Sequence, residues 1–307
     1  MKILDGYQEK NLHFKWSPEN KPVMDIEPGE TITIRIPDSS TMQIKRNFTA
    51  SDMRNIDNSR VDAAVGPVYV HGAKPGDVLK VKIEKIETGN WGWSAIIDNF
   101  GVLSNRFQEK LVIWGIDKNE AETEDQEFLR GVKIPIEPFL GITGTAPAEG
   151  SYGMIPPQNF GGNMDNRFLK EGSVLYLPVN VDGALVSFAD PHAAQGDGEV
   201  CGTAIETSCE ATVNIDLIHD MHISYPRLES FESVKSSYMV SMGIGKSMED
   251  AARDALKEMI AILNGHGFTA EEGYILCSVA GKLRISEMVD MPNFVVSMAL
   301  DKDLISR

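Results

Sequence analysis

Apolar and polar residues alternate along several stretches in the first two thirds of the chain. Apolar residues stand at every second position of Thr31–Ile36, and Val78–Glu87 repeats this pattern over a longer stretch. A period of two places one set of side chains in a core and the other in water, which predicts half-buried β-strands. Further strands are predicted at Val68–Val70, Val132–Ile136, Ser173–Val179, Ala184–Ala189 and Thr212–Ile218.

Turn-forming residues separate these stretches. Glu27-Pro28-Gly29 precedes the first predicted strand, and Lys74-Pro75-Gly76-Asp77 precedes the long one. Glycine and proline interrupt regular structure because they need or impose special backbone angles. Asp182-Gly183 separates two predicted strands and predicts a tight hairpin turn with positive φ at both positions.

The pattern changes to a helical period near the C-terminus. Ser247 stands three residues before Asp250, an acidic capping box that predicts the start of a helix. The apolar residues that follow fall on one helical stripe. Thr269 and Glu272 repeat the box and predict a second helix, which extends through Val279.

Two predicted strands flank these helices: Tyr238–Val240, which Gly243 ends, and Asn293–Leu300. The predicted fold class is mainly β, with sandwich- or barrel-like subdomains of mostly antiparallel strands and an α+β C-terminal part. Residues 1–235 form the predicted β body that carries the active site. Residues 236–307 form an α+β segment packed on that body.

Composition and charge exclude several classes of function. The chain has 307 residues, a hydrophobic share of 42% and a net charge of −16. A nucleic-acid-binding protein usually has a basic surface, so we expect no such partner. The acidic run Glu120–Glu127 predicts a solvated loop. No stretch approaches the roughly 18 apolar residues that cross a membrane, and Met1–Lys15 lacks the apolar core of a signal peptide. The three cysteines indicate no disulfide framework, so the expected compartment is the reducing cytoplasm.

The segment Asp190–Glu199 contains the densest set of residues able to bind a metal or transfer a proton. It reads Asp-Pro-His-Ala-Ala-Gln-Gly-Asp-Gly-Glu and follows a predicted strand. One imidazole with carboxylates at short spacings suits zinc or another divalent ion. Because the spacing matches no standard zinc signature, a polar glycine-rich loop that caps a sheet is the alternative interpretation.

A second polar group occurs in Gly161–Arg167, where two glycines lead into Asn163 and Asp165. A bent backbone there would present Asp165, although an ordinary turn has the same composition. His71 ends a predicted strand and can therefore reach a site. His219 and His222 follow a strand, in which residues three apart point to opposite faces, so they are interpreted as structural.

Cys201 is the candidate for a nucleophilic mechanism. A reactive cysteine needs a nearby base or a positive environment. The acidic neighbours of Cys201 would instead raise the pKa of its thiol, which favours a buried structural cysteine. The string Gly245-Lys246-Ser247 lacks the upstream glycine of a phosphate-binding loop.

Three separated motifs resemble the acetamidase/formamidase family. They are Tyr69–Asp77 (YVHGAKPGD), Gly161–Asp165 (GGNMD) and Phe188–Glu206 (FADPHAAQGDGEVCGTAIE). The resemblance extends from Trp16 to the C-terminal strand. It implies an amide hydrolase that releases ammonia from formamide, acetamide or similar short amides. It also implies a mostly β, commonly oligomeric protein that uses zinc, or alternatively calcium.

The resemblance assigns roles to individual residues between Gly161 and Glu206. Asp165 matches the aspartate of the GGNMD motif, whose Gly161, Gly162 and Asn163 are expected to contact the substrate or its oxyanion. His71 is also expected to contact the substrate or its oxyanion. An acidic residue is common in the family at this position, so the histidine indicates altered specificity. The implied metal ligands are Asp165, Asp190, His192, Asp197 and Glu199, and the implied catalytic residues are Asp165, His192 and Glu199.

The predicted mechanism is hydrolysis of a small amide by a metal-activated water. A carboxylate of Glu199 or Asp190 would take the proton of the water and deliver it to the departing ammonia. Two alternatives remain: a metal-independent amidase with Cys201 as nucleophile, and a non-enzymatic protein that binds a small ligand or calcium. A homodimer or a larger homo-oligomer is expected.

Overall fold

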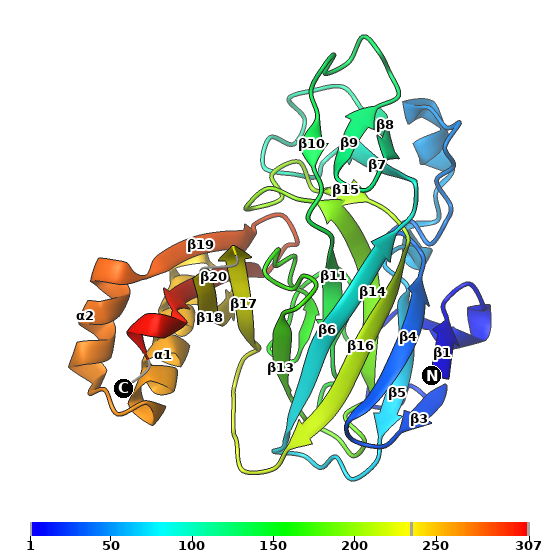
Figure 1. Cartoon of the computed structure of the whole chain (residues 1–307). Coiled ribbons are helices and arrows are strands. Elements are labelled where there is room, and N and C mark those ends of the chain that lie inside the picture. The colour runs from blue at the N-terminus through cyan, green and yellow to red at the C-terminus, as the bar shows by residue number, and fades with distance from the viewer. Residues whose placement is uncertain (1, 234–235, 306–307) are drawn as a thin grey trace.

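Two large β-sheets dominate the protein and confirm the prediction of a mainly β fold with a few C-terminal helices (Figure 1). The computed structural model describes residues 2–233 and 236–305. The nine-stranded sheet has the order β1 (Lys2–Asp5), β4 (Glu30–Ile36), β16 (Cys209–Ile218), β6 (Val78–Thr88), β13 (Val174–Pro178), β17 (Arg227–Ser233), β18 (Ser236–Gly245), β20 (Phe294–Asp301) and β19 (Lys282–Glu287).

The second sheet has eleven strands and carries most of the candidate site. Most neighbouring strands in both sheets are antiparallel; β1 beside β4 and β3 beside β5 are parallel. The order along the main path is β10 (Ile134–Pro135), β9 (Glu120–Thr123), β8 (Lys110–Ile116), β7 (Trp91–Ile96), β15 (Ile205–Glu206), β14 (Val186–Ala194), β11 (Phe139–Gly144) and β12 (Gly161–Asn163). Off this path, β5 (Ala64–Val70) pairs with β14 and with both β2 (Leu12–His13) and β3 (Met24–Ile26).

The main core lies between the two sheets. The apolar residues of β4, β6 and β16 face those of β5, β11 and β14, and their side chains form one buried cluster. Ile32 and Ile34, every second residue of β4, are fully buried in it, as the alternating sequence predicts. Burial of such side chains contributes about 1.5–3 kcal/mol each relative to exposure. The face-to-face arrangement is a β-sandwich.

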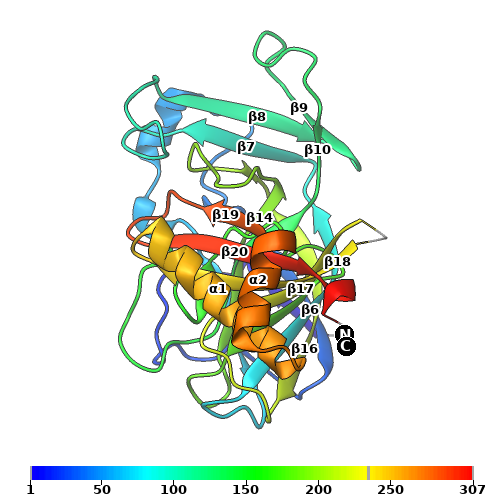
Figure 2. The ribbon, with the colours of Figure 1, turned by 90° about the vertical axis from the view of Figure 1, so that its left-hand side faces the viewer.

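The two predicted helices are present and begin at the predicted caps. The hydroxyl of Ser247 accepts a hydrogen bond from the N–H of Asp250, and α1 runs over Met248–Gly265. Thr269 and Glu272 form a reciprocal capping box at the start of α2, which runs over Ala270–Ala280. Figure 2 shows both helices covering one face of β18 and β20.

Several predicted elements differ from the structure in extent. The strand predicted to end near Gly243 continues to Gly245. A side chain at Gly243 would meet the Ala251 backbone of α1, so the glycine serves to let the helix approach the strand. The predicted strand Val132–Ile136 shrinks to β10. The acidic run Glu120–Glu127 is not wholly a loop, because its first residues form β9.

The hairpin predicted at Asp182-Gly183 is wrong. The flanking strands β13 and β14 belong to different sheets, so the segment is a crossover between the two layers. Positive φ occurs at Gly183, Ala184 and Leu185, but not at Asp182. The expected boundary at residue 235 lies outside the described residues; β17 and β18 pair on either side of it, and the domain division stays a prediction.

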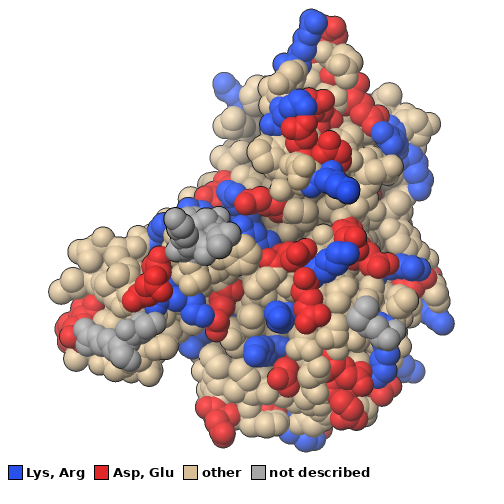
Figure 3. All heavy atoms as spheres, in the orientation of Figure 1, with Lys and Arg blue, Asp and Glu red and all other residues tan. Residues whose placement is uncertain are grey.

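Four short 3₁₀ helices complete the described elements: η1 (Glu9–Asn11), η2 (Ala50–Asn55), η3 (Asn58–Arg60) and η4 (Lys302–Leu304). On the face shown in Figure 3, Lys and Arg are interspersed with Asp and Glu. Among the described residues, no helix is both long and apolar enough to span a membrane.

Candidate functional site

Strand β14 carries two predicted site residues, and both point into the interior. Asp190 and His192 are separated by one residue and are almost completely buried. The predicted strand ends at Ala189, but the observed strand continues through Pro191 to Ala194, because β11 and β15 pair with it on both sides. His192 stands opposite Glu206 of β15, and its ring packs edge-on against Phe139 of β11.

The backbone is strained at three of the acidic residues. Asp165, Asp190 and Glu199 all have left-handed φ angles, of 40°, 54° and 46°. Such angles cost a non-glycine residue about 1–3 kcal/mol and concentrate at functional sites. Gly141 of β11 leaves room for two of these carboxylates. A Cβ at this position would lie 2.6 Å from Asp165 Oδ1 and 2.7 Å from Asp190 Oδ2.

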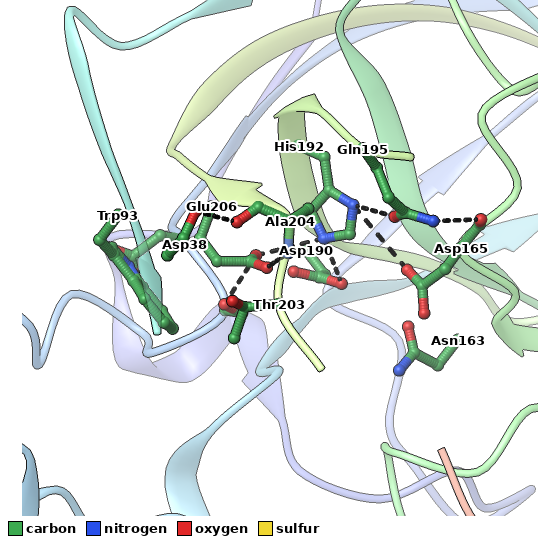
Figure 4. Close-up of polar contacts among 12 residues, drawn as sticks. Asp38, Trp93, Asn163, Asp165, Asp190, His192, Gln195, Thr203, Ala204 and Glu206 are labelled. Carbon is green, nitrogen blue, oxygen red and sulfur yellow. Dashed lines mark hydrogen bonds and ion pairs between the residues drawn. The ribbon is translucent and has the colours of Figure 1, made fainter. Parts of the chain in front are cut away.

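The imidazole of His192 lies at the centre of the group (Figure 4). Its Nε2 is 3.0 Å from Asp190 Oδ2 and 3.2 Å from Glu206 Oε2. Neither contact has the direction of a hydrogen bond, so this buried nitrogen has no hydrogen-bond partner. Its Nδ1 lies 3.9 Å from Asp165 Oδ1. Ring and carboxylates therefore point at a common small volume.

Gln195 fixes which ring nitrogen of His192 carries a proton. The Gln195 side-chain amide donates to the carbonyl oxygens of Asp165, at 2.9 Å, and Ser286, at 3.3 Å. Its Oε1 therefore faces His192 Nδ1, at 2.9 Å, and an amide oxygen only accepts. Nδ1 must carry the hydrogen, and Nε2 is left to present a lone pair or a second proton to the carboxylates.

A second group of ligand atoms consists only of oxygens. One carboxylate oxygen each from Asp165, Glu199 and Asp290 lies within 4.8 Å of the others. The Asn163 side-chain amide donates to Asp290 Oδ2 at 2.8 Å, which leaves Asn163 Oδ1 buried and without a partner. Both carboxylate oxygens of Asp165 are also buried without a hydrogen bond.

Crowding shifts the pKa values of these groups. Burial raises the pKa of Asp165, Asp190, Glu199 and Asp290, and neighbouring carboxylates add to the shift. Burial lowers the pKa of His192, but the charges of Asp190 and Glu206 outweigh it and hold the pKa well above its usual value.

Three further acids at the site behave differently from one another. Burial raises the pKa of both Asp62 and Glu287 to about 8. Glu206 has a pKa below its usual value, because the charge of His192 and several hydrogen bonds outweigh the effect of burial. The hydroxyl of Ser39 and the N–H of Ala204 donate two of those bonds, at 2.9 and 2.7 Å.

A cavity of about 520 Å³ opens onto the carboxylates. Five acidic residues of the group line it: Asp165, Asp190, Glu199, Glu206 and Asp290. Apolar side chains line the other part, and they come from residues 44–61, 93–100 and Ile155. A mostly apolar concave site with a few convergent polar groups is the usual form of a small-molecule site.

The structure brings together most of the predicted site residues, but not all. Asp165, Asp190, His192, Glu199 and Asn163 form the group described above. Asp197 is exposed and is not part of the group; its carboxylate lies 3.8 Å from the guanidinium of Arg167 and 3.9 Å from that of Arg284.

His71 lies away from the group. The N–H of Val70, at the end of β5, donates to the carbonyl of Gly183, which comes just before β14 begins. His192 is near the other end of β14. The exposed ring of His71 contacts Asp25. Gly161 and Gly162 belong to β12, and the N–H of Gly161 donates a hydrogen bond to the Gln158 carbonyl.

The prediction of a buried thiol at Cys201 is wrong. Cys201 is exposed, whereas Cys209 and Cys277 are buried. Its sulfur contacts the carbonyl and hydroxyl oxygens of Thr203, at 3.3 and 3.7 Å, in a loop beside the cavity. Neither oxygen is a base of the kind that activates a thiol.

The sequence reading did not select Gln195, Glu206 or Asp290. Gln195 and Glu206 lie within the motif Phe188–Glu206, but the motif alone indicated no role for either residue. Asp290 has no local signal, because it reaches Asn163 from a segment 127 residues away in the chain. Only the tertiary structure reveals that contact.

The acetamidase/formamidase family matches residues 4–153 and 148–307. This chain belongs to that family. An acetamidase from Yersinia enterocolitica superposes with a TM-score of 0.90 at 31% identity, covering 100% of this chain and 93% of its own. An acetamidase from Bacillus halodurans gives 0.89 at 28% identity, with 98% of each chain covered. A formamidase from Methylophilus methylotrophus is 25% identical over 97% of this chain and 90% of its own length.

Proposed function

We propose that this protein hydrolyses short aliphatic amides to a carboxylate and ammonia at the buried carboxylate group. Family membership and the relatives named acetamidase and formamidase support the reaction class. The observation that carries the location is the convergence of five carboxylates on one cavity, with the buried imidazole of His192 in contact with two of them. In the reaction, the oxygen of water bonds to the carbonyl carbon, the C–N bond breaks, and the nitrogen leaves with an added proton.

The residues of this group fit a divalent cation. Buried ionised carboxylates need a compensating charge, and the positive charge that lowers the pKa values of Asp165, Asp190 and Glu199 is that of His192. Both Asp165 oxygens, Asp190 Oδ1 and His192 Nε2 are buried without hydrogen bonds. A bound divalent ion would polarise the carbonyl or lower the pKa of a water molecule.

The donor atoms favour zinc over calcium. Asp165, Asp190 and His192 supply an imidazole nitrogen with carboxylate oxygens, a set that suits zinc. The all-oxygen group with Glu199 and Asp290 resembles the donors of calcium more closely. We propose zinc at the first set, with Gln195 orienting the imidazole ligand through Nδ1, as outer-shell partners of metal-binding histidines do.

Glu199 is the carboxyl that we propose for proton transfer. It lines the cavity and belongs to groups with both His192 and Asp165. Because burial raises the pKa of Glu199, its side chain can hold a proton at pH values where an exposed glutamate cannot. It would accept a proton from the attacking water and give it to the departing nitrogen.

Asn163 is proposed to orient the amide group of the substrate. Its Nδ2 donates to Asp290, so its free Oδ1 is an acceptor directed into the site. An acceptor there suits the N–H₂ end of a primary amide, rather than a developing oxyanion. A substrate N–H would satisfy the buried oxygen and hold the scissile bond beside Glu199.

Ammonia release from formamide, acetamide and propionamide, with and without a chelator, tests the reaction and the metal together. We expect turnover that a chelator abolishes and that Cys201→Ala retains. Activity that resists chelation but disappears in Cys201→Ala would establish the cysteine alternative. Binding of amides without ammonia release would show a binding protein instead.

Self-association and a cytoplasmic location are further parts of the proposal. Helix α2 exposes Tyr274, Ile275 and Val279, and the edge strand β19, which follows it in the chain, exposes Leu283 and Ile285. Exposed apolar side chains of this kind favour burial against a second copy of the chain. The three free cysteines are compatible with a reducing compartment. Light scattering measures the assembly directly.

A further inference from the structure

The cavity is much larger than the amides considered so far require. Its volume of about 520 Å³ falls in the range of pockets that hold drug-sized ligands, roughly 300–1,000 Å³. Acetamide has only four non-hydrogen atoms. A substrate of that size, held at the carboxylates, would leave most of the cavity filled with water.

Much of the lining away from the carboxylate group is apolar, although Arg54, Asn58, Asp98, Asn99 and Glu109 also contribute to it. The apolar part includes Ile44, Met53, Ile56, Trp93 and Ile97, which belong to one apolar cluster. Ile44 and Trp93 are buried, but Met53, Ile56 and Ile97 remain partly exposed where they line the cavity. Apolar surface that stays wet in the free protein is stabilised when a ligand covers it.

This apolar wall is held in place by its own hydrogen bonds. The buried carboxylate of Asp38 accepts from the Ser40 hydroxyl at 2.7 Å, from the Met42 N–H at 2.8 Å and from Trp93 Nε1 at 3.3 Å. The Ser40 hydroxyl in turn accepts from the Ile44 N–H at 3.0 Å. The wall is therefore built before any ligand arrives, which lowers the entropic cost of binding.

The wall and the carboxylates lie at adjoining parts of the same cavity. In Figure 4, Trp93 and Asp38 lie on one side of Glu206, and Asp165 and Asn163 lie on the other. The hydroxyl of Ser39 joins the two parts by donating to Glu206 Oε2. A molecule bound at the carboxylates can thus extend directly onto the apolar wall.

Hydrogen bonding decides which end of an amide faces each part. The carboxylates and Asn163 Oδ1 are acceptors, so they attract the N–H₂ group. The acyl group then points toward the apolar wall. Of the described residues that line the cavity, Arg54 alone is a Lys or Arg, and it is paired with Glu109 at 3.2 Å. A neutral hydrocarbon therefore fits this part better than an anionic acyl group.

We propose that residues 44–61 and 93–97 form an acyl-binding subsite, and that the preferred substrates are primary amides with apolar acyl groups larger than acetyl. The inference rests on the proposed amide hydrolysis and adds its substrate preference. Each methylene buried on the wall contributes about 0.8 kcal/mol, equivalent to about a fourfold gain in kcat/KM. Hexanamide has four more methylenes than acetamide, so we expect a gain of at least about 50-fold.

The test compares kcat/KM for hexanamide and acetamide by ammonia release, using the whole metal-loaded protein. Ile56→Trp narrows the subsite and is expected to reduce the hexanamide-to-acetamide ratio to about one-tenth or less. Met53→Ala removes contacts and is expected to lower the ratio several-fold. The matched control is Ile3→Trp, at a 54% exposed position on the edge strand β1, which should leave the ratio unchanged.

The outcomes separate this inference from the proposed function. A wild-type ratio at or below one, with ammonia released from acetamide, would overturn the subsite and leave amide hydrolysis in place. No ammonia from either amide would overturn both. Circular dichroism checks that each variant is folded, and if Ile56→Trp is not, the milder Met53→Ala decides. A ratio that neither folded variant changes would also contradict the assignment.

Discussion

Acidic residues occur in two settings in this protein, and the chain neutralises them in only one. In the surface segment around β9, Glu122 pairs with Lys133 at 3.3 Å and Asp125 with Lys110 at 3.4 Å, while Glu124 contacts Arg46. In the buried group, the acids face one another and His192.

The pKa values differ in the same way. The backbone N–H of Glu127, together with Lys110, lowers the pKa of Asp125, so this exposed carboxyl is ionised without cost. Burial raises the pKa of Asp190 and Glu199 well above the usual range. Each of these three surface acids has a Lys or Arg beside it, whereas the buried acids share His192. The net charge of the chain does not reveal this distinction, because both kinds of acid contribute to it equally.

The largest expected effect comes from removing one buried acid. Asp165 belongs to two of the three candidate ligand groups, so Asp165→Ala should release the metal and reduce amide turnover at least about 1,000-fold. The matched surface change, Glu122→Ala, should alter turnover less than about twofold, because exposed ion pairs contribute little. Metal content and ammonia release are measured on both. Equal effects of the two substitutions would show that the buried setting has no special role.

A smaller effect is expected from a residue that only orients a ligand. Gln195→Ala removes the acceptor of His192 Nδ1–H, which should weaken metal affinity about 10–100-fold. Gln8→Ala is the control, because the exposed side chain of Gln8 donates a hydrogen bond to Asp5, away from the buried group. Titration with a competing chelator measures the affinity, and turnover at saturating metal should largely recover. Unchanged affinity would contradict the positioning role of Gln195.

The response of stability to pH gives the third comparison. For the metal-free protein, Glu287 has a pKa of about 8 when folded and an ordinary value, about 4.3, when unfolded. Between these values the unfolded state loses its proton first, so the stability due to protonated Glu287 is complete at low pH and declines as pH rises. Asp62 contributes in the same direction.

We therefore expect the Tm of the metal-free protein to fall between about pH 5 and 8, and bound metal to reverse that fall. Asp125 acts oppositely but weakly, because its lowered pKa removes stability only as pH falls below about 4. Calorimetry across this range, with Glu287→Gln as the comparison, measures the slope. A Tm that rises from pH 5 to 8 without metal would refute the account.

The parts of the fold that could be predicted from sequence are those whose pattern is local. Strands β4, β6 and β16 alternate because one face of each packs in the core, and both helices begin at recognisable caps. No strand was predicted over β11, because Gly141 and Gly144 interrupt its apolar pattern and glycine usually indicates a turn. Gly141 is required there because Asp165 and Asp190 leave no room for a side chain.

The candidate site was predictable only in part, for a similar reason. The motif residues Asp165, Asp190, His192 and Glu199 were found, three of them within one short segment. The strand through Asp190 and Pro191 was not, because these residues disfavour strands and only pairing with β11 and β15 overrides that preference. Contacts made across long separations, such as that of Asp290, leave no pattern in the sequence.

If the buried acids act on amides only with a divalent ion, adding that ion must restore the activity of metal-free protein. The most direct measurement is ammonia release from formamide by metal-free protein as zinc is added, one equivalent at a time. The account predicts less than about one-hundredth of full activity without metal, and recovery that is complete near one equivalent per chain. Full activity in protein whose measured metal content is negligible would contradict it.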